Sequence, residues 1–141
     1  MCQLIREGAV MSQDAPGNAG AVAWPGLFAA EQAVARMQAK LHLWTARDKG
    51  RRFGDLFNLV YDPAFLRVAW ERVATNKGAS TPGIDAATAG RIEAEGGVAE
   101  LLGQIRDSLK SGEFRPVEVR RVLIPKKSGK LRKLGIPTEA A

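Results

Sequence analysis

Apolar residues recur at steps of three and four along much of the chain, which is the spacing of one face of an α-helix. The first such segment runs from Leu27 to Ala46 and ends before Gly50. The second starts at Asp62-Pro63, where a capping carboxylate precedes a proline suited to the first helical position. The third carries apolar residues from Val98 to Leu109. The pattern predicts three main helices.

The second and third helices have recognisable ends. Asn76-Lys77-Gly78 follows the second helix and Gly112 follows the third, and both are typical stop signals. Between them we expect a loop, Gly78 to Asp85, and a short helix capped by Asp85 and ended by Gly96-Gly97. The face of the second helix that we expect to be buried comprises Phe65, Leu66, Ala69, Trp70 and Val73.

The pattern changes after Phe114-Arg115-Pro116. Val117 to Ile124 is rich in Val, Leu and Ile without helical spacing and predicts a strand, and Leu131 to Ile136 predicts a return strand after a turn at 127–130. The predicted class is therefore α+β, with a flexible leader (1–26), a helical region (27–112) and a basic β-hairpin region (113–141). A lone hairpin is marginal in water, so this one needs further support.

Charge is concentrated in the hairpin region. The chain has a net charge of +6, and the segment from Arg115 to Lys133 has eight bases against one acid, Glu118, which makes that segment +7. The remaining thirteen bases and fourteen acids sum to −1. Cations gathered on one segment indicate a local site for a polyanion.

Other chemistry finds little support in the residues. One cysteine, Cys2, and one histidine, His42, supply neither a disulfide nor a zinc site. Glu93 and Glu95 point apart on a helix, and no pair of carboxylates is placed to hold catalytic Mg²⁺. Gly129-Lys130 lacks the other residues of a phosphate-binding P-loop. No apolar run is long enough to span a membrane, and we expect a cytoplasmic protein.

The predicted hairpin is the strongest candidate site. Its strands place bases around one turn, namely Arg120, Lys126, Lys130, Arg132 and Lys133, in an arrangement that suits an RNA backbone or a triphosphate. The interleaved Val, Leu and Ile residues argue against a disordered basic tail. A merely solvated basic hairpin and a localisation signal are the alternatives.

Three blocks of sequence carry a resemblance to a known family. NKGASTPGID, LKSGEFRP and VRRVLIPKKSGKLRKLGIPT occur in an order and spacing similar to the N-terminal part of bacterial group II intron-encoded reverse transcriptases, or maturases. The resemblance covers roughly Lys40 to Thr138. It implies a partial fingers subdomain of a right-hand polymerase fold.

The resemblance also implies roles for individual residues. By motif position, Lys126 and Arg132 match the two bases that contact the triphosphate of the incoming dNTP. Bases expected to contact the intron RNA or template are Lys77, Arg115, Arg120, Arg121, Lys127, Lys130 and Lys133. No catalytic or metal-binding residue is assigned, because the Mg²⁺ ions of the complete enzyme are held by palm aspartates, including a Tyr-x-Asp-Asp motif that these 141 residues lack.

The chain departs from the family pattern in two places. Ala86 follows Asp85 where a glycine is usual, and the sequence stops at Glu139-Ala140-Ala141, where the next family block begins. We therefore expect an N-terminal fragment or truncated reading frame that has no polymerase activity alone. Two alternatives stand beside this interpretation: a free-standing RNA-binding protein without enzymatic activity, and a relic without function.

Overall fold

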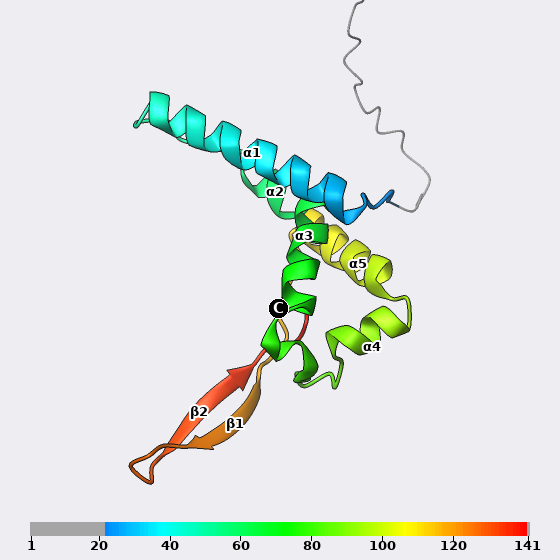
Figure 1. Ribbon diagram of the computed structural model, residues 1–141, viewed down its shortest axis with the longest axis vertical. Helices are drawn as coiled ribbons and strands as arrows, with labels where there is room; N and C mark the ends of the chain where they lie inside the picture. Colours follow the sequence, from blue (N-terminus) through cyan, green and yellow to red (C-terminus); the bar gives the residue numbers. More distant parts are fainter. Residues whose placement is uncertain (1–21, 141) are drawn as a thin grey trace, which may run out of the picture.

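The structure is a computed structural model that describes residues 22–140, and it comprises a helical body from which one β-hairpin extends (Figure 1). Helices and a two-stranded antiparallel sheet confirm the predicted α+β class. Most of the expected leader, 1–26, lies outside the described residues, and the division into three regions stays a prediction. Within the described residues, no helix is long and apolar enough to cross a membrane.

The helical body contains the three predicted long helices and three shorter elements. The α-helices are α1 (Leu27–Arg47), α2 (Phe57–Val60), α3 (Pro63–Ala74), α4 (Ala89–Ala94) and α5 (Val98–Ser111), and a 3₁₀-helix, η1, spans Lys77–Ser80. The sequence pattern did not predict α2 or η1, because four residues are too few to show a helical period. Gly112 ends α5 in the left-handed conformation, at φ +75°.

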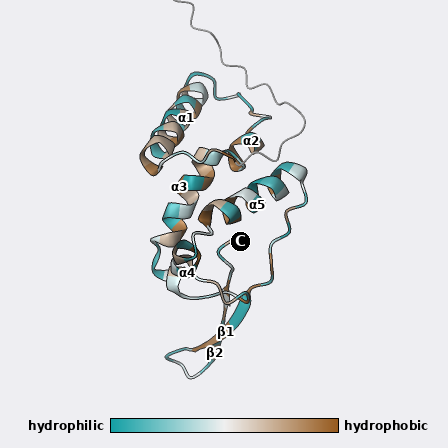
Figure 2. Ribbon diagram, turned by 90° about the vertical axis from the view of Figure 1, so that its right-hand side faces the viewer, coloured by the Kyte–Doolittle hydropathy of each residue, from teal (hydrophilic) through white to brown (hydrophobic). Residues whose placement is uncertain are grey.

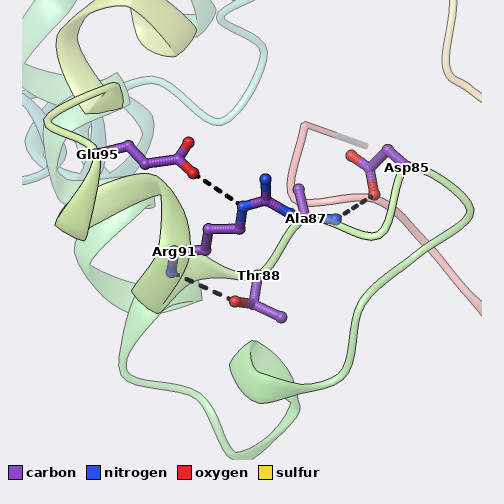
Figure 3. Close-up of polar contacts among 5 residues, drawn as sticks. All are labelled: Asp85, Ala87, Thr88, Arg91 and Glu95. Carbon is purple, nitrogen blue, oxygen red and sulfur yellow. Dashed lines mark hydrogen bonds and ion pairs between the residues drawn. The ribbon is translucent and has the colours of Figure 1, made fainter.

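Two helix starts illustrate a correct prediction and a correction. The Asp62 carboxylate accepts the backbone N–H groups of Ala64 (2.9 Å) and Phe65 (3.4 Å), so it caps α3 as predicted. The expected cap of α4 was wrong: Thr88 Oγ1 accepts the N–H of Arg91 at 3.3 Å, whereas Asp85 accepts the N–H of Ala87 at 3.2 Å (Figure 3). Asp85 lies too early in the chain to reach the first turn of α4.

Helix α3 lies between two small clusters of buried side chains. Leu66 and Trp70 pack with Ala89 and Leu102 on one side, while Val68 packs with Ala30 and Val34 of α1 on the other. Because α3 is covered from two sides, its buried positions do not form the single stripe that was expected. The expected burial of two residues was wrong: Ala69 is exposed, and Val73 is 38% exposed.

The end of α1 carries a small stack of aromatic and basic side chains. The guanidinium of Arg51 lies 4.8 Å from the ring centre of Trp44 and 5.3 Å from that of Phe53. Trp44 is half-buried beside this stack and does not join either core cluster.

The hairpin consists of β1 (Arg120–Pro125) and β2 (Leu131–Ile136), and residues 120–136 are called the arm below. The first strand begins three residues later than predicted, and the preceding Val117 and Val119 are 50% and 53% exposed. Both Figure 1 and the perpendicular view in Figure 2 show the arm projecting away from the helices. Neither strand packs extensively against a helix.

Candidate nucleic-acid interface

The register of the arm sorts its basic side chains onto two faces. Arg120 pairs with Ile136, Val122 with Leu134 and Ile124 with Arg132, and these directly opposed residues share one face of the ribbon. Arg121, paired with Gly135, and Lys133, paired with Leu123, lie on the other face because side chains alternate along a strand.

The turn of the arm extends the first of these faces. The Lys126 N–H donates to the Lys130 carbonyl at 2.8 Å, and the Gly129 N–H donates to the Lys126 carbonyl at 3.0 Å. With Gly129 at φ +77°, this is a three-residue loop with a glycine in the left-handed position. Lys126 and Lys130 therefore continue the register as an opposed pair, on the same face as Arg120 and Arg132. We call these four residues the four-base face.

The structure brings most of the candidate residues onto the arm and leaves two outside it. Lys126 and Arg132, the candidate nucleotide contacts, are diagonal neighbours on the four-base face. Lys127 lies in the turn. Arg115 precedes the arm and donates to the carbonyl oxygen of Phe114 at 3.0 Å. Lys77 is the first residue of η1 on the helical body, and Gly78 and Ala79 of this element line a cavity together with the end of β2.

The bases of the arm have no acidic partners in the part of the chain that the structure describes. The ion pairs found there are Arg67–Glu71 and Arg91–Glu95, both within helices of the body (the second in Figure 3). All six bases of the two faces are exposed, as is Lys127. Unpaired cations on a ribbon repel each other, and an anionic ligand relieves this repulsion.

The root of the arm meets the helical body at a close backbone contact that the sequence did not predict. A methyl group added at Gly83 would lie 2.8 Å from the carbonyl oxygen of Pro137 and 2.9 Å from the Cα of Thr138. Thr138 is 5% exposed. No local signal identifies this contact, because the two partners lie more than fifty residues apart. The contact joins the block NKGASTPGID to the end of the block VRRVLIPKKSGKLRKLGIPT.

Two carboxylates approach each other beside this contact. Burial raises the pKa of Glu139 above its ordinary value and the Asp85 carboxylate raises it further, whereas the backbone N–H of Ala89 lowers it. Within residues 22–140, no three His, Cys, Asp or Glu side chains come together in a group that could hold a metal ion.

The sequence is similar to a protein encoded by a group II intron. Over 87 residues, which make up 61% of this chain, it is 42% identical to the group II intron-encoded protein LtrA of Lactococcus lactis subsp. cremoris. Over 104 residues, 74% of this chain, it is 41% identical to protein YkfC of Escherichia coli strain K12. No family model matches the chain. The matched segments span 14% of LtrA and 27% of YkfC, so the chain corresponds to a small part of each relative.

Proposed function

We propose that this chain is an RNA- and nucleotide-contacting segment of a group II intron reverse transcriptase, equivalent to part of its fingers. In this role Lys126 and Arg132 bind the triphosphate of an incoming dNTP, and the other candidate bases bind the backbone of the intron RNA or template. The proposal concerns phosphate binding and assigns no catalytic residue to the segment.

One observation carries the proposal: Lys126 and Arg132 share a face of an exposed ribbon on which no carboxylate neutralises them. A lysine supplies a mobile point charge, whereas the planar guanidinium of an arginine binds two phosphate oxygens at once. Two such groups on neighbouring positions fit a chain of phosphates better than an isolated anion. The relation to an intron-encoded protein supports RNA as the natural polyanion.

A salt titration with matched double variants tests this proposal. The variant Lys126→Gln/Arg132→Gln removes two charges from the four-base face, and Arg121→Gln/Lys133→Gln removes two from the opposite face. For each protein, binding to a fluorescent single-stranded RNA is measured at several salt concentrations, with and without competing dNTP and Mg²⁺. The plot of log K against log salt should become less steep by about 0.7 for every phosphate that the variant no longer neutralises.

The two variants should differ in their response to the triphosphate. Both should weaken RNA binding, but dNTP should bind the wild type and the Arg121/Lys133 variant and fail to bind the Lys126/Arg132 variant. Equal dNTP binding by the two variants would show that the nucleotide assignment is wrong. Absence of RNA binding by the wild type at low salt would contradict the proposed function as a whole.

A further inference from the structure

The arm is attached to the helical body through a narrow joint. Its second strand leaves the ribbon at Ile136 and passes directly against the loop that contains Gly83. Gly83 is buried, and its carbonyl accepts the N–H of Ala86 at 3.3 Å, which closes a turn in that loop. The loop therefore presents a fixed backbone surface to the strand, with no side chain between them.

Little else holds the arm in a particular direction. The strands pair with each other and expose both faces, and a cavity of about 400 Å³ lies beside the joint between η1 and the end of β2. Side chains do not fill that space, so the close backbone contact of Gly83 with Pro137 and Thr138 is a main point at which the body fixes the root of the arm.

We propose that Gly83 is a positioning residue, which seats the root of the arm so that the arm and Lys77 on the body present their cations to the same ligand. This inference rests on the proposed function, because it takes the shared ligand to be RNA. Lys77 lies in η1, which borders the cavity at the joint, so the direction of the arm sets the distance from Lys77 to the arm's bases. Any side chain at residue 83 pushes the root away, since a single methyl group already meets backbone atoms at 2.8–3.0 Å.

The direction of the arm can be measured without any ligand. In a Cys2→Ser background, spin labels at Ser128→Cys in the turn and Ala39→Cys on α1 report the distance between arm and body by pulsed electron paramagnetic resonance. Both label sites are exposed. The Gly83→Ala change is compared with Gly90→Ala, which makes the same chemical change in α4 at a position where the added methyl group meets no atom within 4 Å.

We expect a narrow distance distribution for the wild type and for Gly90→Ala, and a shifted or broadened one for Gly83→Ala. Circular dichroism checks that each variant is folded. If Gly83→Ala does not fold, Thr138→Ala takes its place, because it removes buried side-chain atoms from the residue whose backbone meets Gly83 and introduces no clash; it should broaden the distribution. If the folded variant at the joint, Gly83→Ala or its substitute Thr138→Ala, has the same distance distribution as the wild type, Gly83 does not position the arm.

RNA binding then tests whether the arm and Lys77 act on one ligand. Gly83→Ala and Lys77→Ala should each lower the affinity about threefold or more, and the double variant should bind little more weakly than either single variant, because both changes disrupt the same interaction. Fully additive effects would overturn the shared site. If the wild type binds no RNA, the proposed function fails, while the distance measurement still decides whether Gly83 positions the arm.

Discussion

Ala86 holds a backbone conformation that L-amino acids avoid, with φ at +56°. Its Cβ makes this left-handed conformation unfavourable by about 1–2 kcal/mol, a cost that glycine does not bear. The Asp85 carboxylate accepts the N–H of Ala87 across this residue, and Thr88 Oγ1 accepts the N–H of Arg91 where α4 begins (Figure 3).

Replacing Ala86 by glycine should stabilise the protein. Relief of the strain exceeds the added entropy of the unfolded chain, about 0.4–1 kcal/mol, so we expect the free energy of unfolding to rise by about 0.5–1 kcal/mol. The control is Ala99→Gly, the same chemical change at an exposed position of α5, where glycine should lower stability by about 0.5–1 kcal/mol. Denaturant unfolding measures both, and a loss of stability in Ala86→Gly would show that the residue is not strained.

Glu139 gives the joint a dependence on pH. Its pKa in the folded protein is raised above the ordinary 4.5, so around these pKa values the folded state binds the proton more readily than the unfolded state does. The stability that this proton contributes is present below the unfolded pKa and is lost as pH rises through the folded pKa. The neutral side chain of Glu139→Gln should avoid this loss of stability. At pH 7 we expect its free energy of unfolding to exceed that of the wild type by no more than about 0.5 kcal/mol.

Unfolding of wild type and Glu139→Gln between pH 4 and pH 7 measures this effect. The exposed Asp107→Asn in α5 removes one carboxylate from the same protein and serves as the control. A Glu139→Gln protein that is less stable than the wild type at pH 7 would show that the bond to the Ala89 N–H outweighs burial and the repulsion by Asp85.

At the scale of elements, the first residues of α3 show how a capping residue recognised in the sequence stabilises a helix. The Asp62 carboxylate satisfies two N–H groups that have no partner within the helix, and Pro63 occupies a position that needs no donor. Asp62→Ala should therefore lower the free energy of unfolding by about 1 kcal/mol. Asp55→Ala is the control, since only the backbone carbonyl of this exposed residue makes a described hydrogen bond. Equal losses in thermal unfolding would contradict the capping role.

Elements of this kind are the part of the fold that the sequence predicts well. The long helices, the Asp62 cap and both strands follow from periodicity and from residues adjacent in the chain. The cap of α4 was misplaced because Asp85 and Thr88 both favour helix starts, and only the path of the loop decides between them. The buried side of α3 was partly wrong because the pattern does not reveal that α1 and α5 cover opposite sides of it.

In the candidate site, too, features set by neighbouring residues were predicted and features set by distant segments were not. Lys126 and Arg132 were singled out from the sequence, and the strand register then places them on one face. The seat of the arm at Gly83 and Thr138 depends on the approach of two distant segments, which no local pattern encodes. The proximity of Glu139 to Asp85 was missed for the same reason.

At the scale of the whole molecule, the helical body and the arm differ in what stabilises them. The body has two buried clusters that share α3, whereas apolar residues of the arm such as Leu123 and Leu131 remain 52% and 61% exposed. An isolated two-stranded hairpin is at best marginally stable, so the arm depends on its seat on the body for a defined position. Its exposed apolar side chains do not contribute to the core of the described residues.

The stability of the whole molecule should therefore respond to a single change in the body. Leu102, 4% exposed, packs in the cluster of Leu66 and Trp70, and Leu102→Ala should cost about 2–5 kcal/mol. That is a large share of the roughly 5–15 kcal/mol by which native proteins are stable. Leu43→Ala on α1 makes the same substitution at a 45% exposed site and should cost less than about 1 kcal/mol. Denaturant unfolding followed by tryptophan fluorescence and by circular dichroism should give coincident transitions for each protein.

A loss of less than about 1 kcal/mol in the free energy of unfolding of Leu102→Ala would show that this cluster does not hold the body together. A tightly packed leucine cannot be removed at so small a cost.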